Sequence, residues 1–152
     1  MSYHVMLDLE TMGNGSDAAI VAIGAVAFSG EHGIIETFYM PVTLSSSVAS
    51  GGIIDPSTVL WWMEQPLAAR EEIYSRKAVD ITLALTEFKE FYSRTTNNKG
   101  SVWGNGATFD NVILGSAYRR SGLGQPWNFR NGLCYRTLKN MFPEILDRKS
   151  VV

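Results

Sequence analysis

The chain of 152 residues has a single cysteine, Cys134, and no long apolar run. One cysteine cannot form an internal disulfide, and the N-terminal residues lack the basic and apolar regions of a secretory signal. The longest apolar stretch, residues 18–28, is interrupted by Gly24 and is much shorter than the roughly 20 residues that span a bilayer. These absences predict a cytoplasmic protein without a membrane-spanning segment.

Basic residues are not in excess either. The chain has 13 Lys and Arg against 15 Asp and Glu, which gives a formal net charge of −2. A module that holds duplex nucleic acid mainly through its phosphates normally carries a basic excess, so this class is disfavoured. A protein whose bound divalent cations supply the positive charge is not excluded. Hydrophobic residues at 45% and charged residues at 18% exclude a disordered chain and favour one domain over residues 1–152.

Three apolar segments in the first third of the chain have the pattern of strands. Residues 3–9 alternate with period two, which places Asp8 and Glu10 on the face opposite Leu7 and Leu9. Residues 19–28 and 34–42 follow, separated by turn-forming residues. The pattern predicts an antiparallel meander of three strands.

The rest of the chain alternates between helical and strand patterns. The Ser- and Gly-rich segment 43–52 predicts a surface loop. We expect helices at 57–64 (opened by a cap at Asp55 or Ser57), 67–76, from 81 onward (capped by Asp80), 109–121 and 135–141, and strands at 101–105 and 129–134. The expected fold class is α/β, with a mixed five-stranded sheet flanked by helices, and several α/β or α+β folds share this order.

Two groups of acids suggest a metal site. Asp8 and Glu10 lie two residues apart on a strand, so their side chains point the same way from Cα atoms about 6.6 Å apart. Asp110 falls in the first turn of a predicted helix, directly after a predicted strand. Each has an ordinary alternative, because a solvated strand end explains the pair and the helix dipole explains Asp110.

At these residues the sequence resembles a known family. DLET near the N-terminus and GNGATFDNVIL about a hundred residues later resemble motifs I and II of the DEDD exonucleases. DLETMGNGSDAAIVAIGAVAF and DPSTVLWWMEQPLAAR resemble, more narrowly, the phage exonuclease A group and the mycobacterial-type 3′→5′ exoribonuclease-like domains. The resemblance covers about residues 3–142. It implies a ribonuclease H-like fold and a metal-dependent 3′→5′ exonuclease that releases nucleoside 5′-monophosphates from single-stranded DNA or RNA ends.

The resemblance also assigns roles to residues. It implies that Asp8, Glu10 and Asp110 bind two Mg²⁺ or Mn²⁺ ions, for which carboxylates are suitable hard ligands. Thr11 and Met12 match family positions that contact the terminal nucleotide and its 3′-hydroxyl. Asn105 and Phe109 belong to the second motif and are expected beside the substrate.

The neighbouring tryptophans Trp61 and Trp62 cannot point the same way in a helix. The simpler interpretation is that one lies in the core and the other is partly exposed. The functional interpretation is that the exposed ring, with Met63, lines a groove for a single-stranded end, where stacking contributes about 1–3 kcal/mol per base.

A third family motif, a His or Tyr followed by an Asp in a C-terminal helix, has no match in this chain. Asp147 lacks a helical setting, His4 lies roughly 13 Å along the strand from Asp8, and His32 falls in a turn. We therefore expect an exonuclease domain truncated before that helix, with a metal site that is only half built. We also expect either self-association through the uncovered face or a longer natural protein from which this chain was cut. A non-catalytic protein that binds nucleic-acid ends with the same fold is the alternative.

The second half of the chain has a mild basic bias. Such charges usually form a solvated face, and contacts to phosphates are the functional alternative. The residues are Arg119, Arg120, Arg130, Arg136, Lys139, Arg148 and Lys149.

Overall fold

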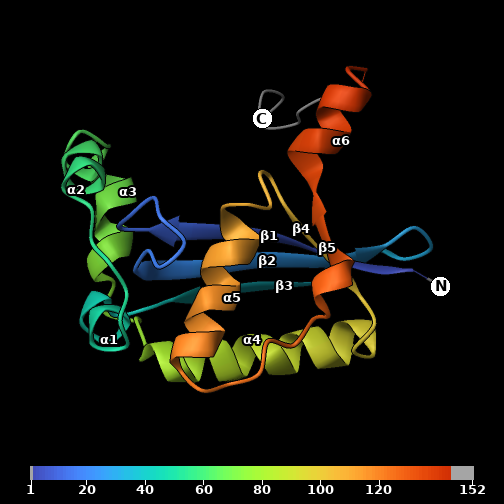
Figure 1. The fold of residues 1–152 in the computed structure, drawn as a ribbon, viewed down its shortest axis with the longest axis horizontal. Helices are drawn as coiled ribbons and strands as arrows, with labels where there is room; N and C mark the ends of the chain where they lie inside the picture. The colour runs from blue at the N-terminus through green and yellow to red at the C-terminus, as the bar shows by residue number, and fades with distance from the viewer. Residues whose placement is uncertain (1, 145–152) are drawn as a thin grey trace.

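A computed structural model describes residues 2–144 of the chain. Five strands form one mixed sheet in the order β3-β2-β1-β4-β5 (Figure 1). The first three strands, β1 (Tyr3–Thr11), β2 (Ile20–Ser29) and β3 (Gly33–Pro41), pair antiparallel. The short strands β4 (Ser101–Gly104) and β5 (Gly132–Cys134) extend the sheet in parallel with β1. The predicted fold class is confirmed.

Helices surround this sheet on several sides. In Figure 1, α4 runs along the lower side of the sheet and α5 crosses in front of it. Helices α2 and α3 lie together at the upper left, and α6 rises at the upper right. The bounds are α1 (Leu44–Ala49), α2 (Pro56–Met63), α3 (Leu67–Glu71), η1 (Glu72–Tyr74), α4 (Ile81–Thr96), α5 (Asp110–Arg120), η2 (Phe129–Asn131) and α6 (Tyr135–Met141). Within residues 2–144 no helix is long and apolar enough to cross a membrane.

The prediction of a loop at 43–52 is wrong, because residues 44–49 form α1. The helix is held by polar contacts that hydrophobic periodicity does not report. The hydroxyl of Ser47 is buried and donates to the carbonyl of Ile20 in β2. The hydroxyl of Thr43 donates to that of Ser46 at 2.7 Å. Two further elements are shorter than predicted, since α3 ends at Glu71 and β5 begins at Gly132.

The main core lies between the sheet and α4. The predicted apolar stripe of α4 is confirmed, since Leu85, Phe88 and Tyr92 are completely buried. The Tyr92 hydroxyl donates to the carbonyl of Gly100 at 2.6 Å, which satisfies its polar atom inside the core. A second, smaller cluster of buried residues lies beneath α2 and consists of Met12, Ala19, Val21 and Trp62.

Candidate functional site

The two acidic motifs meet where β4 ends beside β1. The last paired residues of these parallel strands are Leu7 and Gly104. Beyond this pair, the backbone N–H of Leu9 donates to Oδ1 of Asp110 at 3.0 Å. The carboxylate of Asp110 therefore provides an acceptor beyond the end of β4. This hydrogen bond ties Asp110 to the residue between Asp8 and Glu10.

The turn before α5 is shaped by two glycines. A side chain at Gly104 would come within 2.5 Å of Oδ1 of Asn111, so only glycine lets α5 begin this close to β4. Gly106 has φ of +99°, which favours glycine. The amide of Asn111 donates to the carbonyl of Val102 at 2.9 Å, which fixes the start of α5 on β4. As a result, Asp110 has a defined position and is only 5% exposed.

Asp8 and Glu10 project from β1 as its alternation predicts. Asp8 is exposed and Glu10 is half-buried, whereas Leu7 and Leu9 are buried. The pairing of β1 with β2 shifts register between Glu10 and Thr11, so the strand becomes irregular directly after the second acid.

Carboxylate oxygens are the ligands that Mg²⁺ prefers, so the chemistry of the three acids fits a divalent ion. As the side chains are placed, however, no three His, Cys, Asp or Glu residues between 2 and 144 form a group that could hold one. The hydrogen bond from Leu9 brings the two acidic motifs together beyond the end of β4, but the three carboxylates do not converge on one metal position. The ligand set of Asp8, Glu10 and Asp110 thus stays a prediction.

A cavity of about 400 Å³ opens beside Glu10. Its walls include four of the predicted substrate-contacting residues, namely Thr11, Trp61, Trp62 and Phe109. Trp62 is 6% exposed and its indole N–H donates to the carbonyl of Thr11 at 2.9 Å, whereas Trp61 is 52% exposed. The two rings meet edge to face. The expected division into one core and one exposed tryptophan is confirmed.

Two other predicted contact residues do not line this cavity. Met12 is 5% exposed and packs in the small cluster with Trp62. Asn105 lies in the turn before α5, where its carbonyl accepts a hydrogen bond from the Arg136 guanidinium at 3.1 Å. Met12 therefore packs against a residue of the cavity wall, whereas Asn105 contacts Arg136.

Three polar residues of the cavity were not predicted. They are Asn14, Ser57 and Thr58. The hydroxyl oxygen of Thr58 is buried and has no hydrogen-bond partner among the described residues. Asp55 was expected as a possible cap of α2, but its side chain makes no capping bond and instead accepts from the backbone N–H of Asn14 at 2.7 Å. That bond joins α2 to the loop after β1, which no local pattern indicates.

A smaller cavity of about 260 Å³ lies beyond Trp61. It shares Glu10, Trp61 and Trp62 with the first cavity and also includes Tyr39 and Glu72. The Tyr39 hydroxyl donates to the Glu72 carboxylate. Burial, this hydrogen bond and the charges of Glu72 and Glu10 raise the pKa of Tyr39, so the phenol stays protonated.

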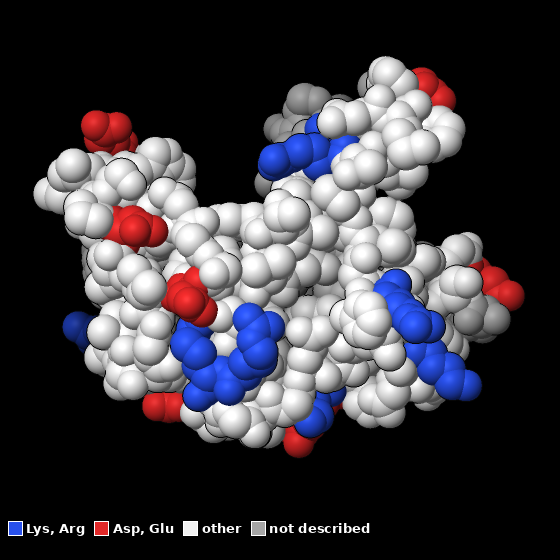
Figure 2. All heavy atoms as spheres, in the orientation of Figure 1, with Lys and Arg blue, Asp and Glu red and all other residues white. Residues whose placement is uncertain are grey.

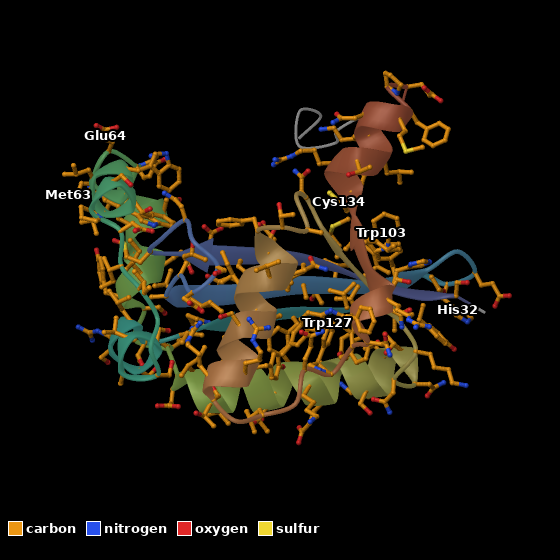
Figure 3. The ribbon with its side chains drawn as sticks, in the orientation of Figure 1. His32, Met63, Glu64, Trp103, Trp127 and Cys134 are labelled. Carbon is orange, nitrogen blue, oxygen red and sulfur yellow. The ribbon has the colours of Figure 1, made fainter. Side chains whose placement is uncertain are left out.

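Neither histidine belongs to the described lining of these two cavities. His4 accepts a hydrogen bond from the indole N–H of Trp103 at 3.1 Å and stacks on Phe28. His32 lies at the far end of the sheet (Figure 3). Asp147, the alternative fourth acid, falls outside the described residues.

Cys134 lies beside the turn before α5, at the start of α6 (Figure 3). Its sulfur accepts from the backbone N–H of Ala107 at 3.5 Å. Hydrogen bonds from Thr137 and from Ala107 lower the pKa of the Cys134 thiol to about 6.

The family of 3′-5′ exoribonuclease Rv2179c-like domains has a sequence model that matches residues 3–151. The chain belongs to this family. It is also 27% identical over 122 residues to an exodeoxyribonuclease of Enterobacteria phage T4, a match that covers 74% of this chain and 54% of the phage protein.

Solved structures of E. coli Exonuclease I share the fold of this family member. The complex with a dT13 oligonucleotide superposes with a TM-score of 0.61 at 19% identity, over 97% of this chain and 32% of Exonuclease I. The complex with a 5cy-dT13 oligonucleotide has a TM-score of 0.65 at 17% identity, over 97% and 31%. The chain thus spans about half the length of the phage relative and about a third of Exonuclease I. These neighbours support the ribonuclease H-like fold.

Proposed function

We propose that this chain is a divalent-metal-dependent 3′→5′ exonuclease that releases nucleoside 5′-monophosphates from single-stranded DNA or RNA ends. Asp8, Glu10 and Asp110 hold the Mg²⁺ or Mn²⁺ ions in this proposal. The observation that carries it is the hydrogen bond from Leu9 to Asp110, which joins residues 101 positions apart and brings both acidic motifs together where β1 continues past the end of β4. Membership of a 3′-5′ exoribonuclease family supports the direction of cleavage.

When bound, such ions polarise the scissile phosphate and activate the attacking water. The protein's own contribution is to hold the carboxylates in place. Asp110 is buried, and the bond from Leu9 restricts how its side chain can turn. Asp8 and Glu10 project from the same strand and therefore follow the same rigid element.

The cavity beside Glu10 suits the terminal nucleotide. Its volume of about 400 Å³ lies within the usual range of small-ligand sites. The exposed ring of Trp61 offers a stacking surface for a base, and Thr11 and Phe109 line the remainder of the space. Stacking on an open ring requires an unpaired base, which favours a single-stranded end over a duplex.

The decisive experiment compares Asp110→Asn with the wild-type chain on 5′-labelled DNA and RNA strands of the same sequence, with Mg²⁺ or Mn²⁺. Asparagine keeps an oxygen that can accept from Leu9, so the fold is retained while the charge is lost. Even changes in residues that only support metal ligands typically cost 10–100-fold, so we expect a loss of about 100-fold or more. The comparison of the two strands determines the sugar preference.

The matched control is Asp80→Asn, because Asp80 caps α4 away from the cavity and asparagine caps equally well. This variant should cleave at the wild-type rate. Equal cleavage by Asp110→Asn and the wild type would contradict the proposed ligand set. Tight binding of the labelled strands by the wild type, with no shortening of these strands in either metal, would support the non-catalytic alternative.

A further inference from the structure

A second cavity of about 320 Å³ opens beside the turn that precedes Asp110. Ala107 and Thr108 belong to its lining, whereas Phe109 lines the first cavity. Neighbouring residues of one turn therefore line both cavities, which places the two spaces next to each other along the chain. The proposed function makes no use of this second space.

The second cavity has an exposed aromatic ring at its rim. Phe129 lines it and is 77% exposed. The ring is carried by η2, whose start is fixed by a hydrogen bond from the Arg130 N–H to Oδ1 of Asn128 at 2.9 Å. Trp127, two residues earlier, is 4% exposed and meets Phe88 and Tyr118 edge to face. Phe129 is thus displayed to solvent from a rigid base and contributes little to the core.

The opposite wall is one face of α5. Asn111, Gly115 and Arg119 are spaced four residues apart, so they share that face, and all three line the cavity. A side chain at Gly115 would lie 2.6 Å from Oε1 of Gln125, so the glycine lets the loop after α5 close the space. The exposed Arg119 then lies one helical turn farther along the same face.

Charge around this cavity differs from charge around the first. None of the described residues that line it is acidic, and Arg119 belongs to its lining. The guanidinium of Arg130 lies 5.7 Å from the centre of the Phe129 ring. In Figure 2, Lys and Arg side chains lie over the lower end of α5, next to an acidic side chain, and others lie farther to the right. Arg120, on the same helix, is paired with Asp17 at 3.0 Å. Two arginines, Arg119 in the lining and Arg130 beside the Phe129 ring, thus supply positive charge at a cavity whose described lining has no acid.

We propose that this cavity is an upstream subsite, defined by Thr108, Arg119, Phe129 and Arg130, which binds a nucleotide of the same single strand on the 5′ side of the one being removed. A base stacks on Phe129, while Arg119 and Arg130 contact backbone phosphates. An aromatic platform with flanking cations is the usual combination for binding single strands without sequence preference. This inference rests on the proposed function, because the position of the 3′ end in the first cavity sets the direction of the strand.

The subsite predicts that activity depends on substrate length. A dinucleotide occupies only the first cavity and its neighbourhood, whereas a longer strand also reaches Phe129. The wild type should therefore have a higher kcat/KM on a long oligonucleotide, through a lower KM. In Phe129→Ala, the loss of one stacked base should weaken binding of the long strand roughly 10-fold. Its kcat, and its activity on the dinucleotide, should stay at wild-type values.

Two further variants test the stacking contribution of the Phe129 ring and the charge contribution of Arg119 one at a time. Phe129→Tyr keeps the ring and should restore the length dependence. Arg119→Ala should lower the slope of log binding constant against log salt by about 0.7, the value expected for one lost phosphate contact to a single strand. Phe142→Ala is the matched control, since Phe142 is 44% exposed beyond α6 and does not line either cavity.

The outcomes distinguish the two proposals. If the wild type cleaves both lengths, and Phe129→Ala affects both equally or neither, the upstream subsite is wrong while the exonuclease stands. If the wild type cleaves nothing, equilibrium binding of a labelled long strand still tests whether the upstream subsite exists. Weaker binding by Phe129→Ala but not by Phe142→Ala would then support the subsite alone, and unchanged binding would overturn it.

Discussion

Helices α2 and α4 contain similar residues and use them differently. Both follow an aspartate and both carry large apolar side chains at helical spacing. In α4 the rings of Phe88, Phe91 and Tyr92 are completely buried. In α2, by contrast, the large side chains are mostly left in solvent. Leu60 is 62%, Trp61 52% and Met63 67% exposed.

The aspartates that precede these two helices also have different roles, one within its own helix and one in binding another segment. Asp80 accepts from the backbone N–H of Thr82 at 2.8 Å and caps its own helix. Asp55 accepts from Asn14 in another segment and does not cap α2. In α4 the side chains stabilise the fold, whereas in α2 they shape the cavity and hold its loop. The comparison shows that residue type alone does not separate a core helix from a site helix.

The largest expected effect tests this comparison through stability. Phe88→Ala removes a completely buried ring that packs against Phe38, Phe91 and Trp127. Such truncations typically cost about 3–5 kcal/mol of the free energy of unfolding. Trp61→Ala, at an exposed position, should cost less than about 1 kcal/mol. Urea denaturation followed by circular dichroism measures both, and equal losses would break the distinction between the helices.

Binding should show the reverse order. Trp61→Ala removes the exposed ring beside Glu10 and should weaken binding of a labelled single strand by about 1–3 kcal/mol. Leu60→Ala, on the same helix but outside the first cavity, is the control and should bind as the wild type does. Fluorescence anisotropy with a single-stranded oligonucleotide provides the measurement. If the two variants bind alike, the first cavity does not hold the terminal base.

The two aspartates allow a smaller and sharper test. Asp80→Ala should lower the free energy of unfolding by about 1 kcal/mol, because the first turn of α4 loses its side-chain cap. It should leave KM unchanged. Asp55→Ala should raise KM, because the backbone N–H of Asn14 loses its partner and the loop beside the cavity is released. A rise in KM for Asp80→Ala, or none for Asp55→Ala, would contradict the division of roles.

The smallest effect concerns α6, at the opposite end of the sheet from α2. Because the pKa of Cys134 is lowered to about 6, its rate of alkylation should rise with pH and reach half its maximum near pH 6. Thr137→Val removes the largest cause and should move this midpoint upward. The thiolate is favoured in the folded state. Its contribution to stability is therefore fully present above the unfolded pKa of about 8.5 and is lost as the pH falls toward 6. A midpoint near the unfolded value would contradict the hydrogen bonds described here.

The site could be predicted in part. The alternation of β1 placed Asp8 and Glu10 on the face opposite Leu7 and Leu9, and the structure confirms that alternation. The family motifs indicated Trp61 and Phe109, which the fold brings to one cavity. Asn14 and Thr58 were missed, because a polar residue in a loop or a first helical turn has no distinguishing pattern. Whether Asp8, Glu10 and Asp110 bind metal stays a prediction, as do self-association and the cytoplasmic location.

The sequence by itself determined the elements whose pattern is local. The three meander strands and the stripe of α4 follow from spacings of two and of three to four residues, which report the buried face of each element. Only the tertiary structure decided which distant surfaces meet. The hydroxyl of Ser47 in α1 donates to the carbonyl of Ile20, and the buried Asp110 accepts from the backbone N–H of Leu9. Such contacts depend on where β1, β2 and β4 lie in the sheet, and periodicity along a segment carries no information about its partners across the fold.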